Sequence, residues 1–215
     1  TPEPHDIDRT LTTGDNNLMM VRSDQLDIPD GPLTLECWFR GHTFAGRTGL
    51  VAKTENSDYG FFVTDGIPSF SIFLGDSYAE ARAPKALLAE GRWHHLAGVY
   101  DGSEVRLYLD GKLIDRVERS GRRRTNDLPL MIGADVDGRG NPMSFFKGEL
   151  DEVRLSTTAR YNDDFRPSQT MQPDADTALL LHFYELFGPW THDASGNHAH
   201  PIKIGEPTLM NVEWR

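Results

Sequence analysis

Short apolar stretches recur along the chain, and most of them alternate apolar and polar residues with a period of two. The clearest is EVRLYLDGKLIDRV (104–117), in which the apolar residues alternate with polar ones up to the Asp110-Gly111 pair. An Asp-Gly pair between alternating segments is typical of a two-residue hairpin turn, because both central residues of that turn need a positive φ. The pattern therefore predicts an antiparallel pair of strands joined at Asp110-Gly111.

The rest of the chain shows the same organisation. Segments rich in β-branched and aromatic residues are separated by glycine, proline, aspartate and asparagine. The predicted strands are 17–22, 33–40, 49–54, 59–64, 69–74, 78–83, 92–100, 104–109, 112–118, 129–133, 145–155, 178–184 and 207–213. The prediction is an all-β fold, with more strands than one open sheet usually holds. Glycine and the two-residue period interrupt every window that could hold an amphipathic helix.

A single segment lacks a strand pattern. Residues 156–176 are polar and end in a proline-containing stretch, so we expect them to cross the molecule as a packed connection with a helical turn near 158–165. The apolar runs resume after this segment. A chain of 215 residues lies within the range of one large all-β domain, so residues 1–215 are predicted to form a single domain.

Two adjacent histidines in GRWHHLAGVYDG (91–102) raise the question of a chemical site. Neighbouring side chains of a strand point to opposite faces, so His94 and His95 cannot readily coordinate one metal ion. The alternation places apolar residues on both faces of this segment. It therefore predicts a strand that is covered on both sides.

Charge excludes some partners. The chain has 22 basic and 33 acidic residues, and its net charge of −11 repels phosphate backbones and anionic bilayers. Nucleic acid is therefore not an expected partner. One basic run is an exception: SGRRRTND contains Arg122, Arg123 and Arg124, close to Arg119. Arginine side chains of this kind could bind a sulfated or uronic-acid glycan through bidentate hydrogen bonds. Such runs are more often solvated loops, and that is our interpretation.

Compartment is only weakly indicated by the sequence. Cys37 is the only cysteine, so no intramolecular disulfide can form, and its place in LTLECWF predicts a small buried residue. No apolar run approaches the ~20 residues of a membrane helix, so we expect no membrane insertion. The chain opens with TPEPHDIDRT instead of methionine, and we interpret it as a mature or excised piece of a larger, multidomain protein.

Four stretches carry a family resemblance: GPLTLECWFR (31–40), GRWHHLAGVYDGSEVRLYLDGKLI (91–114), FKGELDEVRLSTTARY (146–161), and ALLLHFYE followed by HDASGNHAH (178–200). In order and spacing they resemble the concanavalin A-like lectin/glucanase superfamily, specifically bacterial laminin-G-like domains. The resemblance extends over nearly the whole chain. It implies a two-sheet antiparallel jelly-roll sandwich, which agrees with the strand count.

In this frame Trp93 is interpreted as a core tryptophan between the sheets. The two histidines that follow it are interpreted as strand residues, satisfied by neighbouring backbone or hydroxyl groups.

Paired carboxylates in GELDEVR (148–154) invite comparison with glycosidases of this fold. Glu149 and Asp151 are predicted to share a strand face, with Glu152 on the opposite one. The related glucanases carry a third carboxylate further along such a run, where this chain has Val153 or Arg154. Without that acid, retaining hydrolysis from this strand is disfavoured, and no catalytic residue is predicted.

The resemblance also implies a structural calcium ion near the N-terminal segment and the strand that contains Asp151. Calcium takes six to eight oxygen ligands from carboxylates, amides and carbonyls. Two loops, GDNN (14–17) and DASGN (193–197), offer such oxygens, although both are also ordinary turn sequences. The predicted ligands are Asp15, Asp151, Asp193 and Asn197.

A second metal hypothesis concerns His192, His198 and His200, which share one short segment with Asp193. These are atom types that zinc prefers, but the sequence fixes no fourth ligand and no supporting residue, so we favour a loop without metal. His182, within LLLHFYE, is interpreted as a satisfied core histidine.

The expected function is a non-catalytic, lectin-like module of a secreted or cell-surface protein, which binds a polysaccharide or glycoprotein and is stabilised by calcium. Sugars stack on exposed aromatic rings, and the aromatics least committed to a core are Tyr59, Tyr78, Trp190 and Trp214. Two alternatives stay open. One is a structural or protein-interaction domain without glycan affinity, and the other is a glycosidase or polysaccharide lyase of the same fold.

Overall fold

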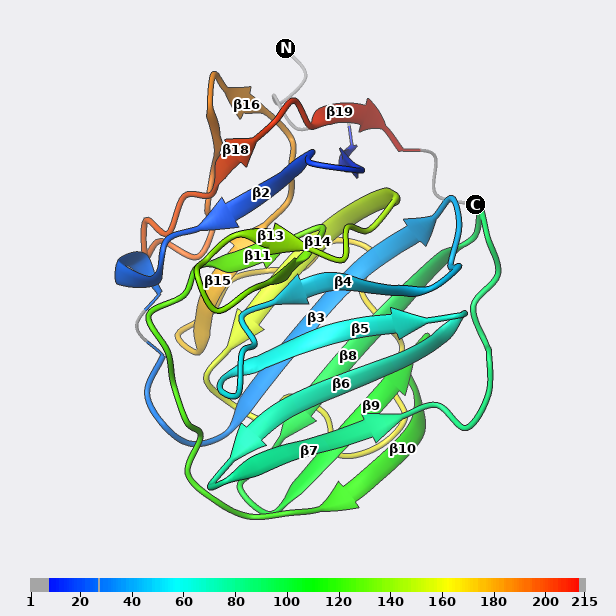
Figure 1. Cartoon of the computed structure of the whole chain (residues 1–215), viewed down its shortest axis with the longest axis vertical. Coiled ribbons are helices and arrows are strands. Elements are labelled where there is room, and N and C mark those ends of the chain that lie inside the picture. Colours follow the sequence, from blue (N-terminus) through cyan, green and yellow to red (C-terminus); the bar gives the residue numbers. More distant parts are fainter. Residues whose placement is uncertain (1–7, 27, 213–215) are drawn as a thin grey trace.

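The computed structural model describes residues 8–26 and 28–212, which form two large antiparallel sheets facing each other across one core (Figure 1). Within this part of the chain there is no α-helix, and a 3-10 turn, η1 (Ser23–Gln25), is its helical element. The all-β fold predicted from the strand pattern is confirmed, and so is the two-sheet sandwich that the family resemblance implies.

The first sheet has eight strands and the second has nine. In the first sheet the order is β10 (Lys112–Glu118), β9 (Glu104–Leu109), β8 (Trp93–Tyr100), β3 (Leu33–Gly41), β14 (Gly148–Ser156), β1 (Arg9–Thr13) and β19 (Thr208–Asn211), with β15 (Thr177–Leu181) also paired to β14. In the second sheet it is β16 (Leu186–Phe187), β17 (Trp190–Thr191), β18 (Ile202–Ile204), β2 (Leu18–Val21), β11 (Leu130–Ile132), β4 (Arg47–Ala52), β5 (Tyr59–Thr64), β6 (Ile67–Leu74) and β7 (Ser77–Arg82). A separate two-stranded ribbon pairs β12 (Asp135–Val136) with β13 (Pro142–Met143).

Alternate side chains of the facing strands fill the space between the two sheets. Leu35 and Phe39 of β3 point into this core from the first sheet, and Phe61 and Phe70 of β5 and β6 enter it from the second. The ring centroids of Phe61 and Phe70 lie 5.5 Å apart, a distance at which aromatic rings attract each other. Cys37 is fully buried in the same core, as its sequence context predicted.

The hairpin at Asp110-Gly111 joins β9 to β10. Asp110 has φ of 51° and Gly111 has φ of 76°, so both turn residues are in the left-handed region that the sequence predicted. A Cβ atom on Gly111 would lie 2.0 Å from the carbonyl oxygen of Phe165. The glycine is therefore required both by its backbone conformation and by the connection that crosses above it.

Strand β8 is covered on both faces, as predicted. Leu96 and Tyr100 point into the main core, while Ala97 and Val99 point the other way into a smaller apolar cluster. That cluster is closed by three aromatic residues, of which two come from the connection that follows β14: Tyr108, Tyr161 and Phe165.

Trp93 does not lie between the sheets, and its interpretation as a core tryptophan is wrong. Counting along β8 from Ala97 places Trp93 on the outer face of the first sheet. Its side chain is half-buried there, and the guanidinium carbon of Arg40 lies 5.2 Å from the ring centroid. The two-residue period groups Trp93 with Ala97 on one face of the strand, but it does not show which face meets the second sheet.

The adjacent histidines are strand residues on opposite faces, so this part of the prediction is confirmed. Their partners are carboxylates instead of hydroxyl groups. His94 Nδ1 lies 3.0 Å from Asp110 Oδ2, and its Nε2 accepts a hydrogen bond from the backbone N–H of Ala89. His95 Nε2 lies 3.2 Å from Glu36 Oε2 in a fully buried setting.

The connection 157–176 has no helical turn, so the prediction for 158–165 is wrong. Two of its backbone groups bond to neighbouring strands and turns: Phe165 N–H donates to Gly111 O, and Arg160 N–H donates to Thr34 Oγ1. The rings of Tyr161 and Phe165 stack at 3.6 Å over the first sheet. Packing of these two rings holds the segment in an extended course.

Candidate functional site

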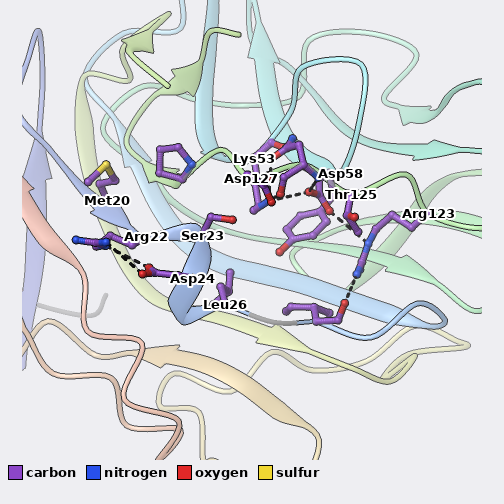
Figure 2. Close-up of a pocket in the computed structure, with 14 residues that line it drawn as sticks. Met20, Arg22, Ser23, Asp24, Leu26, Lys53, Asp58, Arg123, Thr125 and Asp127 are labelled. Carbon is purple, nitrogen blue, oxygen red and sulfur yellow. Dashed lines mark hydrogen bonds and ion pairs between the residues drawn. The ribbon is translucent and has the colours of Figure 1, made fainter. Parts of the chain in front are cut away.

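A cavity of about 660 Å³ opens where η1, β2 and the loop between β10 and β11 meet (Figure 2). We call it the η1 cavity, because Ser23 and Asp24 of η1 form part of its rim. Polar residues from the ends of β4 and β5 line one side, and Leu26 and Ile28 line another. Binding pockets for small molecules are commonly 300–1,000 Å³, so this cavity has the size of a ligand site.

The polar side of the cavity begins with a tight loop between β4 and β5. Asn56 and Asp58 adopt φ of 50° and 48°, which asparagine and aspartate tolerate better than most residues. The loop folds back so that Lys53 Nζ donates to Asp58 Oδ2 over 2.8 Å. Lys53 Nζ also donates to the side-chain oxygen of Asn126 over 2.8 Å, and Asn126 N–H donates to Asp58 over 3.0 Å. Both Lys53 and Asp58 are buried.

Arg123 joins this network from the loop that precedes β11. Its Nη2 donates to the carbonyls of Ile28 and Pro29 over 2.6 and 3.2 Å, and its Nε lies 3.3 Å from Asp58 Oδ1 (Figure 2). The guanidinium carbon is 5.6 Å from the centroid of the Tyr59 ring. Arg123 therefore connects three segments that are far apart in sequence, and its side chain is buried among them.

Three buried atoms of residues lining the η1 cavity make no hydrogen bond: the hydroxyl of Tyr59, and Nε and Nη1 of Arg123. Nε is ion-paired with Asp58 over 3.3 Å, which leaves the Tyr59 hydroxyl and Arg123 Nη1 unused. Buried polar atoms are nearly always hydrogen-bonded, so such exceptions need a cause. Burial, followed by the charge of Asp58, raises the pKa of Tyr59, which keeps its hydroxyl protonated. The cavity thus presents two unused donors to any oxygen acceptor that enters it.

The opposite side of the cavity is more exposed. Arg22 and Asp24 form a surface ion pair there, with Nη2 3.1 Å from Oδ2, and Met20 lies beside them (Figure 2). Leu26 and Pro129 add apolar surface to the lining. The cavity therefore combines apolar walls with polar groups, as sites for sugars and other hydroxylated ligands do.

Three of the four aromatic residues considered as sugar contacts lie within the described residues, and they are in three different places. Tyr59 lines the η1 cavity. Tyr78 lines a separate trough of about 390 Å³ along the outward side of β5 to β7, and its hydroxyl donates to the carbonyl of Ser57. Trp190 stacks on Phe187 in the β16–β17 hairpin, with ring centroids 4.8 Å apart. Trp214 lies outside the described residues.

The four predicted calcium ligands are not gathered into one site. Within residues 8–26 and 28–212, no three His, Cys, Asp or Glu side chains form a group able to hold a metal ion. Asp15 pairs with Lys147, whose Nζ lies 2.7 Å from Oδ2. Asp193 accepts hydrogen bonds from its own loop, including the N–H groups of Ser195 and Ala199. Asn197 uses its amide nitrogen to donate to the carbonyl of Thr177 and so also serves the turn.

Asp151 is different, because part of its carboxylate is unused. Its Oδ1 accepts the N–H of Glu152 over 2.8 Å, while its buried Oδ2 has no hydrogen-bond partner. Burial raises the pKa of Asp151 well above its usual value, and the charges of Glu152 and Asp8 raise it further. Asp8 belongs to the N-terminal segment, which is where the resemblance placed a calcium ion.

Glu152 does not point away from Asp151 in a regular strand, and that prediction is wrong. The pairing of β14 with β3 shifts register between Asp151 and Arg154, and Glu152 has φ of 49°. The bulge inserts an extra residue and breaks the alternation. Glu152 Oε1 lies 2.5 Å from His182 Nδ1, so His182 is a satisfied, mostly buried histidine as predicted.

Glu149, the other carboxylate of this strand, is occupied by two neighbours. Its Oε2 lies 3.0 Å from Arg40 Nε, and its Oε1 lies 2.8 Å from His42 Nε2.

The rings of His192 and His198 both approach His200, with centroids 5.3 and 5.7 Å away. His200 Nδ1 accepts the backbone N–H of Asp193, which leaves that nitrogen unavailable to a metal.

The main residues that sequence reasoning missed are Lys53, Asp58, Arg123 and Asn126. The arginine run had been interpreted as a solvated loop, which is wrong for Arg123, although Arg122 is exposed and pairs with Asp30 on the surface. The only available signal was that the run contained several arginines, and the sequence could not show which of them turns inward.

Comparison with known proteins gives a family and a set of similar structures. A family model described as "Concanavalin A-like lectin/glucanases superfamily" matches residues 13–164. No curated protein sequence matches the chain. The described residues include no helix long and apolar enough to cross a membrane.

Three solved structures illustrate the likeness of fold. A Bacteroides ovatus protein, provisionally described as carbohydrate binding, is 18% identical with a TM-score of 0.77, and the match covers 97% of this chain and 61% of that one. Domains LG4-5 of the mouse laminin alpha1 chain are 21% identical with a TM-score of 0.56, covering 77% and 47%. The CBM40 module of a Ruminococcus gnavus sialidase, bound to alpha2,3 sialyllactose, is 11% identical with a TM-score of 0.54, covering 72% and 93%.

Proposed function

The chain belongs to the concanavalin A-like lectin/glucanases superfamily, and from this premise we propose that it is a non-catalytic carbohydrate-recognition module whose glycan binds in the η1 cavity. The observation that carries the proposal is the pair of buried, unused donors, Tyr59 Oη and Arg123 Nη1, in the lining of a cavity of about 660 Å³. Sugar hydroxyl and ring oxygens are acceptors that would satisfy both groups.

The lining suits a sugar in a second respect. Met20, Leu26 and Pro129 provide apolar surface against which the C–H groups of a pyranose ring can pack. Acceptors for sugar hydroxyls are available from Asp24 and Asp127 at the rim. The proposal is also supported by two proteins of similar fold: the Bacteroides ovatus protein is provisionally described as carbohydrate binding, and the Ruminococcus gnavus module is bound to alpha2,3 sialyllactose.

The test is retention of the protein by a panel of immobilised glycans, comparing the natural chain with Tyr59→Phe and Arg123→Gln. We expect Arg123→Gln to lose retention by at least about tenfold, since a hydrogen bond to a charged donor contributes about 1.5–3 kcal/mol. Tyr59→Phe should lose it by about two- to tenfold, since a neutral hydrogen bond contributes about 0.5–1.5 kcal/mol. Tyr78→Phe is the matched control and should bind as the natural chain does. If Tyr78→Phe alone loses binding, the glycan occupies the trough beside β7 and the η1 cavity is not the site.

A hydrolase or lyase function has less support. The carboxylates of β14 are paired or buried: Glu149 is bonded to Arg40 and His42, and Asp151 is inaccessible to solvent. Release of reducing sugar or unsaturated product from the glycans that bind would overturn the non-catalytic part of the proposal. A chain that binds no glycan, yet folds as described, would favour the structural or protein-interaction alternative.

We also propose a calcium ion beside Asp151. The support is an unpartnered, buried carboxylate oxygen on Asp151 with the further negative charges of Asp8 and Glu152 around it, an arrangement that a cation would relieve. Calcium should raise the melting temperature of chelator-treated protein. The rise should vanish in Asp151→Asn and persist in the control Asp15→Asn, and an equal rise in both variants would refute the assignment.

The proposed context is a longer protein at the cell surface or outside the cell. The chain spans 61% of the Bacteroides ovatus protein and 47% of the laminin fragment, so its relatives carry further parts. Its net charge of −11 disfavours nucleic acid and anionic membranes, and the partners we propose are polysaccharides and glycoproteins.

A further inference from the structure

The buried polar network of the η1 cavity carries one uncompensated positive charge. Lys53 and Arg123 are both cationic, and both are bonded or paired to the single carboxylate of Asp58. Asn126, the fourth member of the network, is neutral. Lys53, Asp58 and Arg123 are 4%, 2% and 5% exposed, so water does little to balance the excess charge.

Other charges near the cavity do not cancel this excess. Arg22 and Asp24 neutralise each other in an exposed ion pair at the rim. Asp30 accepts the backbone N–H of Arg123 but pairs its other oxygen with exposed Arg122. Asp127 is exposed at the opening, where solvent and salt screen its charge. The buried cation remains without a counter-charge, and burying an unpaired charge is costly.

The position of the excess charge is also defined. All donors of Lys53 are used, by Asp58 and by two oxygens of Asn126. Arg123 uses Nη2 for two carbonyls, while its Nη1 makes no hydrogen bond. The unused end of a guanidinium, lining the same cavity as the free hydroxyl of Tyr59, is an arrangement that accepts the oxygens of a carboxylate.

We infer that the ligand of the η1 cavity is an acidic sugar whose carboxylate binds Arg123 Nη1 and the Tyr59 hydroxyl. This inference rests on the proposed function, because it specifies the class of glycan that the cavity takes. A carboxylate brings one negative charge, which equals the excess of the buried network. A neutral sugar satisfies the two donors but leaves the excess positive charge unbalanced. A chain with an overall charge of −11 thus selects an anion through one local, buried cation.

The experiment compares matched pairs of probes that differ in the acidic group: glucuronate and glucose oligomers, galacturonate and galactose oligomers, and sialyllactose and lactose. A sulfated polysaccharide is added to distinguish sulfate from carboxylate. We expect at least one acidic member to bind about tenfold or more tightly than its neutral partner, because a charge-assisted hydrogen bond contributes about 1.5–3 kcal/mol.

Lys53→Met is the decisive variant. It removes the excess charge but leaves Arg123 and Tyr59 in place, so it should reduce the preference for the acidic member toward parity while neutral binding persists. Arg124→Gln, which removes an exposed arginine of the same run that does not line the cavity, is the control and should keep the preference. If Lys53→Met does not fold, Tyr59→Phe provides the second readout, with a larger loss of affinity for the acidic probe than for its neutral partner.

The outcomes separate the inference from the proposed function. Three results overturn the inference: equal binding of acidic and neutral probes, binding of the sulfated polysaccharide alone, or an unchanged preference in Lys53→Met and Tyr59→Phe. In each case the proposal that a glycan binds in the cavity still stands if Arg123→Gln abolishes glycan binding. Failure of every probe to bind overturns both.

Discussion

Replacing Tyr59 by phenylalanine should stabilise the unliganded protein while weakening its binding of glycan. The side chain is 1% exposed, and its hydroxyl has no hydrogen-bond partner. A buried hydroxyl without a partner costs about 1–3 kcal/mol relative to a paired one. The substitution removes the oxygen but keeps the ring in its place beside Arg123, so we expect the free energy of unfolding to rise by about 1 kcal/mol.

Tyr100→Phe is the matched control for this prediction. Tyr100 is 2% exposed, but its hydroxyl donates to the carbonyl of Gly121 over 2.8 Å, lies 3.1 Å from the carbonyl oxygen of Gly102, and accepts the N–H of Gly121. Removal of the Tyr100 hydroxyl leaves these backbone groups without a hydrogen-bond partner, so the free energy of unfolding should fall by about 1 kcal/mol. Two equally buried tyrosines are therefore expected to respond in opposite directions.

Urea unfolding followed by tryptophan fluorescence measures both effects, and a thermal melt gives an independent reading. For a chain of this size, 1 kcal/mol corresponds to about 2–4 °C in melting temperature. If Tyr59→Phe loses as much stability as Tyr100→Phe, the Tyr59 hydroxyl has a partner in the free protein. The argument that the η1 cavity offers an unused donor would then fail.

Further predictions concern the framework that holds the site. Burial by itself raises the pKa of Glu36, but hydrogen bonds and charges from His95 and Arg154 outweigh it and lower the pKa below its ordinary 4.5. Stability from Glu36 is therefore present above pH 4.5 and lost as pH falls through the lowered pKa, and Glu36→Gln should flatten that acid dependence in urea titrations. At neutral pH the same variant leaves Arg154 without its buried carboxylate and should lose about 3–5 kcal/mol, whereas a loss under about 1 kcal/mol contradicts the ion pair. Gly111→Ala should cost more than about 1 kcal/mol, because its Cβ would meet Phe165 O at 2.0 Å, and an unchanged melting temperature would contradict this packing.

Local periodicity was sufficient to predict most of the fold. The alternation in 104–109 and 112–118 and the Asp110-Gly111 turn located their strands within a residue or two, because both signals depend on neighbours in the chain. Strand β1, which is short and rich in threonine, and the two-residue strands β16 and β17 gave no such signal. Their pairing is decided by distant partners.

The errors in the framework also have tertiary causes. The connection 157–176 was expected to include a helical turn, but Tyr161 and Phe165 pack on the first sheet and hold it extended. The bulge at Glu152 depends on the register of β14 against β3, which no local pattern reveals. Trp93 was assigned to the wrong face because periodicity groups residues by face without showing which face is inside.

The candidate site could be predicted only in fragments. Tyr59 was selected as an aromatic uncommitted to the core, yet it is nearly fully buried, and what makes it a candidate is its unpaired hydroxyl. Arg123 lies in a run of arginines whose other members are more exposed, and the sequence did not distinguish it from them. The cavity exists because segments 28–30, 53–58 and 123–126 converge in the folded chain. No local sequence pattern predicts contacts between these distant segments.

The most direct test of the account is a crystal structure with the acidic oligosaccharide that the protein binds best. The account predicts a sugar in the η1 cavity, with its carboxylate within hydrogen-bond distance of Arg123 Nη1 and the Tyr59 hydroxyl. A sugar seated instead in the trough beside Tyr78 or on the Trp190 hairpin, with the η1 cavity unchanged, would contradict it.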